Sequence, residues 1–239
     1  MSGIAIITAR GGSKRIPKKN IRDFCGRPII AYSIEAAVNS GIFDEVMVST
    51  DSEEIADISR KYGAKVPFMR SEKTAGDFAT TADVIFEVLN EYKKLGMAFD
   101  WMACLYPTAP FVTAEKLKEA YRIFKESGAE ELEPVVPYSF PPQRCFVKDE
   151  TGTFVQYKYK QYIKSRSQDL EKMYHDAGQF YFIDIAAYTD SILNHGELGG
   201  YDLKIAPLIL DDLEVQDIDN ETDWKLAEMK YKLMAEKNA

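Results

Sequence analysis

Short apolar runs alternate with segments of helical periodicity through the first half of the chain. A short unbroken apolar run is typical of a strand buried on both faces, and apolar positions three and four apart predict a helix. A glycine follows each predicted helix, as expected for the residue that most readily adopts a left-handed conformation. The pattern predicts strands at 4–9, 44–50, 66–69 and 101–105, and helices at 29–39, 53–62, 81–95 and 114–127.

Strands and helices that alternate in this way predict an α/β fold. The expected architecture is a Rossmann-like three-layer sandwich, in which helices cover both faces of a mostly parallel sheet. Ligands bind outside the carboxyl ends of the strands in such folds. This rule gathers residues 9–20, 49–51 and 106–110 at one edge of the sheet, where we expect the functional site.

The alternation is interrupted from about Pro137. Two short alternating segments on either side of Gly152 predict a β-hairpin, and aromatic and basic residues then alternate over 156–162. We refer to residues 137–162 as the arm. It is either an exposed hairpin with a solvated face or a dimerisation arm, and we favour the second because its aromatics would leave an apolar patch on a monomer.

Regular elements return after the arm. The final helix is amphipathic, and we expect Trp224, Leu226, Met229 and Leu233 to lie on its buried side. The chain shows neither internal repeats nor low-complexity segments, so we treat 1–239 as a single domain. The later elements are predicted as a strand at 180–185, a helix at 184–193, a strand at 204–209 and a helix at 221–235.

Composition narrows the class of protein. Hydrophobic residues make up 46% and charged residues 28% of the chain, which is ordinary for a globular domain. No apolar run approaches the roughly 18 residues of a membrane span, and no secretion signal precedes the first strand. Cys25, Cys104 and Cys145 have the spacing of neither a disulfide framework nor a zinc site. We therefore expect a cytoplasmic protein that associates with no membrane and, at a net charge of −8, with no nucleic acid.

A basic loop follows the first predicted strand. Residues 10–27 contain seven Lys and Arg and one Asp, within an acidic chain. Gly11 and Gly12 free the backbone for a tight turn whose N–H groups can point at an anion. The spacings of a P-loop and of a dinucleotide-binding fingerprint are both absent. On these residues alone the loop is either a polyphosphate site or a solvated surface turn.

The loop resembles that of a known family. Residues 6–20, I-I-T-A-R-G-G-S-K-R-I-P-K-K-N, are similar to the nucleotide-binding loop of the CMP-nonulosonic acid synthetases, or acylneuraminate cytidylyltransferases. The resemblance covers nearly the whole chain and implies transfer of CMP from CTP to a nonulosonic sugar acid, with release of pyrophosphate and with Mg²⁺ as cofactor. It continues, in order, through 28–37, 48–56, 62–70, 106–113 and 217–223.

The resemblance assigns one set of residues to the nucleotide. Basic and hydroxyl residues of the loop match phosphate-contacting positions, and Arg10 and Lys19 would be catalytic because they neutralise charge that develops on phosphoryl oxygens. Thr80 and Thr81 match positions near the base edge, although either could also be a helix N-cap. The implied set is Arg10, Gly11, Gly12, Ser13, Lys14, Lys19, Asn20, Arg70, Thr80 and Thr81.

Asp217 and Asp219 form the second chemical signal. In an extended segment residues two apart point the same way, so both carboxylates can meet one hard cation. Mg²⁺ favours one or two carboxylates together with phosphate oxygens and water. From the residues alone, the pair is equally well a turn and N-cap before the last helix. The resemblance favours metal binding by both and a catalytic role for Asp217.

Departures from the family pattern suggest the acceptor sugar. Tyr106, in Y-P-T-A-P, stands where the sialate enzymes have glutamine, and His175 stands where they tend to have arginine. With the aromatic run after Gln179, these residues look like those of the pseudaminic acid cytidylyltransferases, whose sugar is more deoxygenated and carries two acylamino groups. The implied acceptor contacts are Tyr106, Arg166, His175, Gln179 and Phe180, of which Arg166 lies one residue from the matching position.

Three functions remain to be compared. The first is synthesis of CMP-pseudaminic acid by a homodimer, and the second is the same chemistry on N-acylneuraminic or legionaminic acid. The third, from a different class, is a nucleotide-binding regulator without turnover. The two acidic residues argue against the third, because a binder does not need them.

Overall fold

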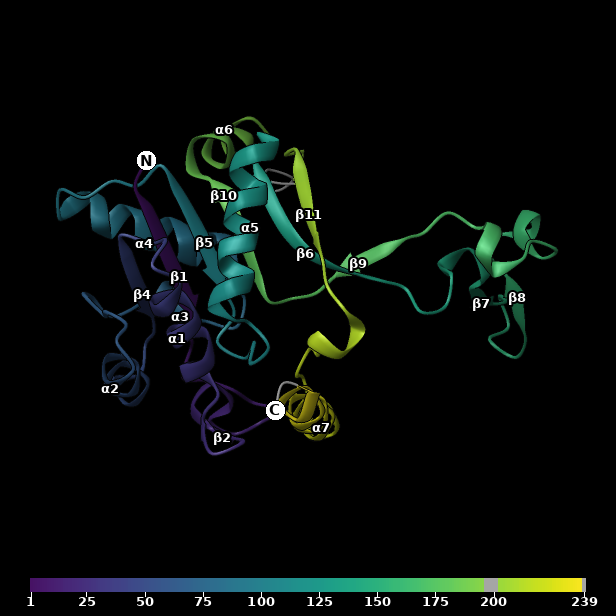
Figure 1. Cartoon of the computed structure of the whole chain (residues 1–239), viewed down its shortest axis with the longest axis horizontal. Helices are drawn as coiled ribbons and strands as arrows, with labels where there is room; N and C mark the ends of the chain where they lie inside the picture. The colour runs from purple at the N-terminus through teal and green to yellow at the C-terminus, as the bar shows by residue number, and fades with distance from the viewer. Residues whose placement is uncertain (196–201, 238–239) are drawn as a thin grey trace.

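A seven-stranded sheet forms the centre of the computed structural model, which describes residues 1–195 and 202–237. The strand order is β11-β6-β10-β5-β1-β4, with β9 paired to β6 (Figure 1). The pairs β1–β4, β1–β5 and β6–β11 are parallel, whereas β10 runs antiparallel to β5 and β6. The strands are β1 (Gly3–Thr8), β4 (Glu45–Ser49), β5 (Trp101–Leu105), β6 (Glu131–Pro137), β9 (Tyr174–Asp176), β10 (Phe180–Asp184) and β11 (Ile205–Ile209).

Helices cover both faces of this sheet. One face packs against α1 (Ile30–Ser40), α2 (Glu53–Lys61) and α5 (Ala114–Ser127), through a core that includes Ile7 and Phe182. The other packs against α4 (Thr81–Lys94) and α6 (Ile185–His195), through residues such as Ile6 and Met102. Successive residues of β1 therefore enter opposite cores, which is why this strand is apolar throughout. The predicted three-layer α/β sandwich is confirmed.

The first half of the chain follows the predicted elements closely. The one wrong element is the strand at 66–69, where Lys65 makes only an isolated bridge to Met47. Pro67 lacks the N–H needed to continue a ladder. The sequence interpretation also missed β6 and β9. The sequence pattern predicts neither strand, because β6 carries two glutamates and Pro134, and β9 is only three residues long.

The final helix packs through a face other than the predicted one. In α7 (Glu221–Lys237), Trp224 is buried with its ring edge-on to Phe24 at 5.6 Å. The predicted partners of Trp224, namely Leu226, Met229 and Leu233, are exposed instead. The buried side continues through Ala227, Tyr231 and Met234 against the short hairpin β2 (Asp23–Phe24) and β3 (Arg27–Pro28).

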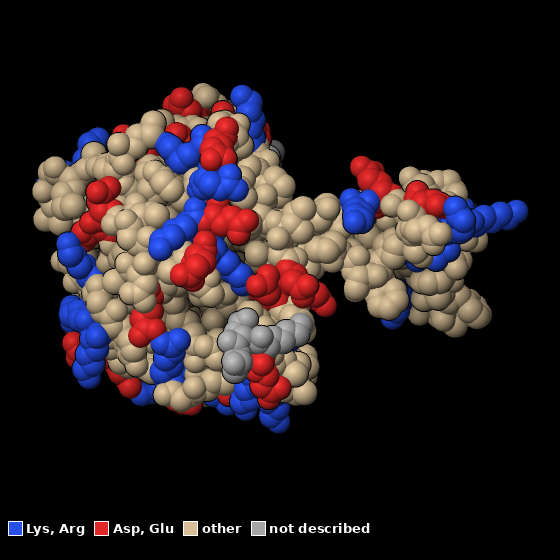
Figure 2. Space-filling view, viewed as in Figure 1, with Lys and Arg blue, Asp and Glu red and all other residues tan. Residues whose placement is uncertain are grey.

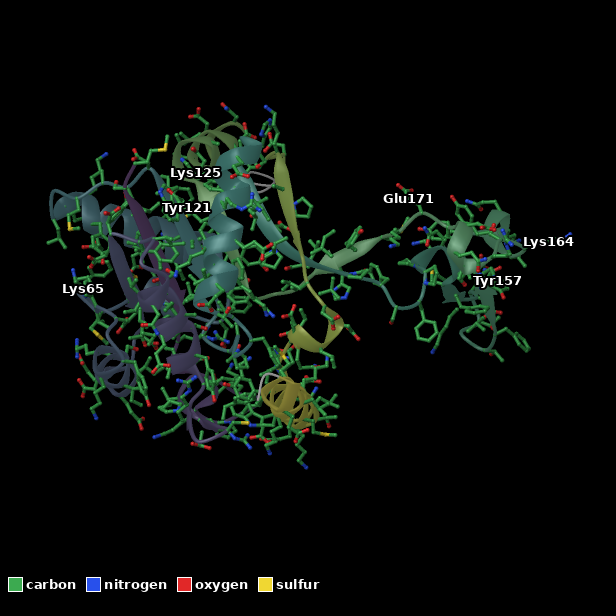
Figure 3. The ribbon with its side chains drawn as sticks, in the orientation of Figure 1. Lys65, Tyr121, Lys125, Tyr157, Lys164 and Glu171 are labelled. Atoms are coloured by element: carbon green, nitrogen blue, oxygen red, sulfur yellow. The ribbon has the colours of Figure 1, made fainter. Side chains whose placement is uncertain are left out.

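The arm projects from the body of the protein (Figures 1 and 2). It leaves the sheet at the end of β6, returns as β9, and so extends beyond the predicted limit at 162. Its hairpin consists of β7 (Phe146–Lys148) and β8 (Val155–Tyr157), an antiparallel pair as expected. Figure 3 shows Tyr157 and Lys164 far from the sheet and Glu171 on the segment that returns to it. No helix among the described residues is long and apolar enough to span a membrane.

Candidate nucleotide-binding site

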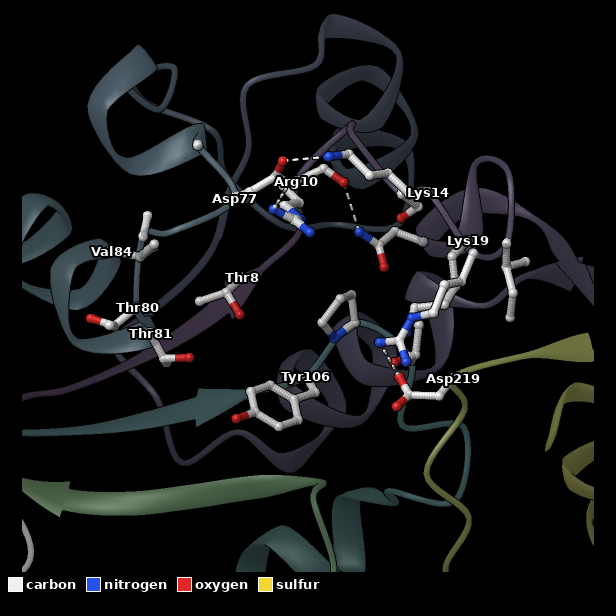
Figure 4. Close-up of a pocket in the computed structure, with 18 of the residues that line it drawn as sticks. Thr8, Arg10, Lys14, Lys19, Asp77, Thr80, Thr81, Val84, Tyr106 and Asp219 are labelled. Atoms are coloured by element: carbon white, nitrogen blue, oxygen red, sulfur yellow. Dashed lines mark hydrogen bonds and ion pairs between the residues drawn. The ribbon is translucent and has the colours of Figure 1, made fainter.

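A cavity of about 390 Å³ opens at the carboxyl ends of β1 and β5, the edge predicted to carry the site (Figure 4). We call it the cationic cavity. The loop after β1, the short α3 (Glu72–Ala75) with the loop that follows it, and the segment before α7 surround it. Of the residues predicted from the sequence, it is lined by Arg10, Ser13, Lys14, Lys19, Asn20, Arg70, Thr80, Thr81, Tyr106, Asp217 and Asp219.

Two of the loop cations share one acidic partner. Arg10 Nη1 donates to Asp77 Oδ1 at 3.1 Å, and Lys14 Nζ pairs with the other oxygen of the same carboxylate (Figure 4). These hydrogen bonds lower the pKa of Asp77. All three side chains are substantially exposed, so the pairs are screened by water and contribute little stability. An anion that enters the cavity can therefore replace Asp77 at low cost.

Lys19 lies deeper than the other cations. Its Nζ donates to the Ile218 carbonyl at 2.7 Å, which ties the loop to the segment before α7. Burial lowers the pKa of Lys19, and the nearby carboxylates of Asp219 and Asp217 oppose that shift. A half-buried ammonium beside two carboxylates holds the loop and the segment before α7 in register.

The other basic residues of the loop region are structural. Lys18 pairs with Glu54 of α2, Arg22 with Glu221 of α7, and Arg27 with Glu35 of α1. Arg22 also lies 4.5 Å from the centre of the Trp224 ring, and Arg27 lies over Tyr32. These pairs fix the edges of the loop, while Arg10, Lys14, Arg15 and Lys19 line the cavity.

Gly11 has a structural role. The Gly11 N–H donates to Asp51 Oδ1 at 2.7 Å, so it points at a carboxylate of the protein, and neither glycine lines the cavity. A Cβ at Gly11 would lie 3.1 Å from Ser52 Cβ, whereas a Cβ at Gly12 would meet nothing. Gly11 is therefore explained by close packing against the start of α2.

Asn20 and Arg70 brace the walls of the cavity. Asn20 Nδ2 donates to the Arg10 carbonyl at 2.9 Å and so holds the loop beneath its first cation. Arg70 is buried, and its guanidinium donates to both the hydroxyl and the carbonyl of Ser49 at the end of β4. Burial lowers the Arg70 pKa.

Thr80 is the N-cap of α4. Its hydroxyl accepts from the Asp83 N–H at 3.2 Å, and the Asp83 carboxylate accepts from the Thr80 N–H, which makes a reciprocal capping box. The N-cap alternative is thus confirmed for Thr80. Thr80 and Thr81 also line the cavity, so the cap fixes part of the cavity wall.

The acidic pair lies opposite the basic loop. Asp217 is exposed, Ile218 is fully buried and Asp219 is partly exposed, so both carboxylates share the side of the chain that faces the cavity. Asp219 pairs with Arg15 at 2.7 Å. Asn220 accepts from the first N–H groups of α7, so neither aspartate is the cap. Among the described residues no three acidic, His or Cys side chains could hold a metal alone, and ligand oxygens would have to complete this set.

A second cavity, of about 940 Å³, adjoins the first at Thr80, Thr81 and Tyr106. It lies between the sheet and the helices α4 and α6, and we call it the acidic cavity. Tyr106 lies at the junction, and its ring is edge-on to that of Tyr181, with 5.7 Å between the ring centres. Burial raises the pKa of Tyr106. Four carboxylates line this second cavity, those of Asp83, Glu131, Glu133 and Asp176.

Four predicted acceptor contacts line neither cavity. Arg166 lies in the arm, where it pairs with Asp169 at 2.7 Å. His175 lies on β9 beside Tyr138 and forms a hydrogen bond with the Asp176 carbonyl. The structure places Phe180 in the core, fully buried, and Gln179 beneath η6 (Asp212–Glu214), where its amide donates to the Glu214 carbonyl.

Sequence reasoning missed several residues that line the cavities. Asp77 falls within the A-G-D-F-A-T-T segment that drew attention only for its threonines, and its charge beside so basic a loop was a usable signal. Arg15 was counted in the basic run without a role of its own. Glu131 and Glu133 belong to a strand that was not predicted, so their alternation with Leu132 went unused.

Comparison with known proteins identifies a family. The cytidylyltransferase family model matches residues 4–189. Pseudaminic acid cytidylyltransferase of Campylobacter jejuni is 41% identical over 237 residues, which cover 98% of this chain and 97% of that protein. CMP-N,N'-diacetyllegionaminic acid synthase of Legionella pneumophila is 35% identical over the same share of each.

The fold is similar to that of a solved structure at low sequence identity. CMP:2-keto-3-deoxy-manno-octonic acid synthetase, solved in complex with CTP, superimposes with a TM-score of 0.68 over 99% of this chain and all of the other. The sequences are 17% identical, so this likeness supports the fold alone.

Proposed function

The chain belongs to the cytidylyltransferase family, and from that premise we propose that it transfers CMP from CTP to a nonulosonic sugar acid, releasing pyrophosphate and forming CMP-pseudaminic acid. One observation carries the proposal. Five cations and three carboxylates from distant parts of the chain meet in one cavity beside a second cavity able to hold a sugar. Identity to pseudaminic acid cytidylyltransferase along nearly the whole chain supports the choice of acceptor.

The proposed reaction makes one bond and breaks one. A sugar hydroxyl attacks the α-phosphorus of CTP, the bond from that phosphorus to the pyrophosphate oxygen breaks, and the hydroxyl proton passes to water. Negative charge accumulates on phosphoryl oxygens, and Arg10 and Lys19 neutralise it from the loop. Arg10 can contact two oxygens at once, whereas Lys14 and Lys19 act as single charges. Arg10 and Lys14 bind the triphosphate by leaving Asp77.

Asp217 and Asp219 fit a magnesium site. Both offer oxygen donors only, both line the cavity, and the helix cap needs neither of them. Magnesium bound there would reduce the negative charge of the phosphates. Burial lowers the pKa of Lys19, and the pair of carboxylates opposes that shift, so the pair favours the charged form of the ammonium.

We propose a homodimer held by the arm. The arm exposes a set of large apolar side chains that the body of this chain does not cover. Arg166 lies in the arm, and His175 lies on β9 at its base. In a dimer these two could serve the site of the other copy, which would explain why they line neither cavity here. The exposed set includes Phe140, Phe146, Phe154, Val155 and Ile163.

Light scattering tests this assembly. The expected mass is twice the 27.1 kDa of the chain, and Phe154→Ser combined with Phe140→Ser should shift it towards the monomer. Phe78→Ser, at an exposed phenylalanine outside the arm, is the matched control and should leave the mass unchanged. A monomer at working concentration for the unaltered chain would contradict the proposal.

Pyrophosphate release tests the function. The purified chain is assayed with each of four nucleoside triphosphates against pseudaminic, legionaminic and N-acetylneuraminic acids. We expect release with CTP and magnesium, and the highest kcat/KM with pseudaminic acid. Faster turnover of legionaminic acid would identify that sugar as the acceptor, in keeping with the 35% identity of this chain to a legionaminic acid synthase. Binding of CTP without release from any acceptor would indicate a regulator.

A further inference from the structure

Glu131 is a buried carboxylate without a partner. Its side chain is 8% exposed, and among the described residues it accepts no hydrogen bond and forms no ion pair. Burial, together with the nearby charges of Glu133 and Asp176, raises the pKa of Glu131 to about 7. Its oxygens are not among the enclosed, unpartnered polar atoms of the described residues, because Glu131 lines the acidic cavity, where water or a ligand can reach it.

The position of Glu131 is set by the register of the sheet. On the neighbouring strands its partners are Ile183 of β10 and Ile205 of β11, and all three line the acidic cavity. Leu132 faces the opposite core, so Glu133 returns to the same side as Glu131. The strand therefore presents two carboxylates to the acidic cavity.

The rest of the wall is apolar or already hydrogen-bonded. Phe86, Ile85 and Ile192 supply apolar surface, and none of the described lining residues is Lys or Arg. Asp176 is satisfied, because one oxygen accepts from the Gly178 N–H and the other from the Tyr181 hydroxyl. Asp83 is satisfied as well, because its carboxylate accepts from the N–H and the hydroxyl of Thr80. Glu131, with Glu133 beside it, is thus the acceptor left for a ligand, and much of the remaining wall is methyl and aromatic surface.

This combination selects the chemistry of an occupant. Carboxylate acceptors bind N–H and O–H donors, while the absence of a lining cation among the described residues disfavours an anionic group. Apolar walls favour methyl groups over hydroxyls, which would lose hydrogen bonds to water. A group that fits has N–H donors beside methyl groups, as a secondary acylamino substituent does.

We propose that the acidic cavity binds the acylamino-substituted, deoxygenated end of the acceptor sugar, with Glu131 accepting a hydrogen bond from an acylamino N–H. This inference rests on the proposed function and deepens it. The junction of the cavities at Tyr106 lets one acceptor reach the nucleotide with its hydroxyl and Glu131 with its substituted end. The acceptor carboxylate then lies outside the acidic cavity.

Glu131→Gln is the variant that tests it. The amide keeps the volume of the side chain and removes a buried charge, so the fold should be retained, as circular dichroism would check. With CTP saturating, the KM for the diacylamino acceptor should rise about tenfold or more, as expected for loss of a charge-assisted hydrogen bond. The KM for CTP should stay within twofold.

Two comparisons make the result specific. Glu119→Gln, at an exposed site on α5, should change neither constant. With N-acetylneuraminic acid, whose polar tail lacks the second acylamino group, Glu131→Gln should change the KM less than with the diacylamino acid. An unchanged KM for the diacylamino acceptor would overturn the inference.

Calorimetric titration of the sugar into the CTP-bound enzyme separates this inference from its premise. If the unaltered chain turns over the acceptor and Glu131→Gln binds it equally well, the inference fails and the proposed function stands. If the unaltered chain neither binds nor turns over any nonulosonic acid, the proposed function fails and the inference fails with it.

Discussion

The two adjoining cavities carry opposite charge, and their charged groups differ in whether they are paired within the protein. In the cationic cavity Arg10 and Lys14 already have an exposed partner in Asp77, which a ligand can displace. In the acidic cavity Glu131 is buried and has no partner among the described residues. The comparison shows two ways to keep a site ready for a ligand: one exchanges an internal anion for an external one, and the other leaves a buried acceptor for the ligand to satisfy.

The largest expected effect comes from removing a cation of the first cavity. Arg10→Ala should reduce kcat/KM by a hundredfold or more with the fold intact, because a charge-assisted phosphate contact worth roughly 1.5–3 kcal/mol is lost and strengthens further in the transition state. Lys18→Ala is the matched control, since Lys18 pairs with Glu54 away from the cavity. Near-normal pyrophosphate release by folded Arg10→Ala would contradict the role of the loop.

The acidic pair of the cationic cavity should rank next. Asp217→Asn and Asp219→Asn keep the shape of the side chain but remove its charge, so each should lower activity by roughly tenfold and raise the magnesium concentration needed for half-maximal rate. Asp190→Asn, on the exposed side of α6, serves as the control. If both variants kept the magnesium dependence of the unaltered enzyme, the pair would be part of a turn only.

Tyr106 divides the two cavities, so its replacement should affect one and spare the other. Tyr106→Gln removes the ring that packs edge-on against Tyr181, and should raise the KM for pseudaminic acid several-fold without changing the KM for CTP. Tyr157→Gln in the arm is the control for loss of a tyrosine. Steady-state kinetics with each substrate varied in turn give the answer, and a changed KM for CTP would place the ring on the nucleotide side.

The last expected effect is on stability and leaves the nucleotide site untouched. The pKa of Glu131 is raised to about 7, so the folded state disfavours its ionised form. This group therefore stabilises the fold fully below its ordinary pKa near 4.5 and loses that contribution as the pH rises through 7.

Thermal unfolding at two pH values checks the sign of this effect. The free energy of unfolding of Glu131→Gln should exceed that of the unaltered chain by up to about 3 kcal/mol at pH 8 and by little at pH 5. Glu119→Gln should follow the unaltered chain at both. An equal difference at the two pH values would show that the gain arises from something other than the charge.

Much of the fold and part of the site could be predicted from the sequence. The helices at 81–95 and 114–127 end at glycines and have strong periodicity, so local signals specify them. The strands β6 and β9 could not be found in this way, because their pairing with β10 and with each other depends on distant residues. The buried face of α7 was misjudged for the same reason, since the contact with Phe24 decides it.

Within the site, motif and position predicted that the loop and the acidic pair lie together, and both line the cationic cavity. Arg10, Lys19 and Asp219 meet because the end of β1 and the segment before α7 lie at one edge of the sheet. The role of Gly11 could not be foreseen, because it depends on how closely α2 approaches. The acidic cavity could not be predicted either, because Glu131 and Glu133 line it only as a result of the position of β6 between β10 and β11.

The central place of β10 bears on how the chain folds as it is made. β10 joins β5 to β6, and so connects the early strands β4, β1 and β5 to the late strands β6 and β11. Until residue 184 has left the ribosome, β5 has an open edge in which all five residues are of the kind that is buried in the finished protein. The arm is synthesised during this interval. We therefore expect folding to be completed late in translation, and chains that end before Phe180 to aggregate through the edge of β5.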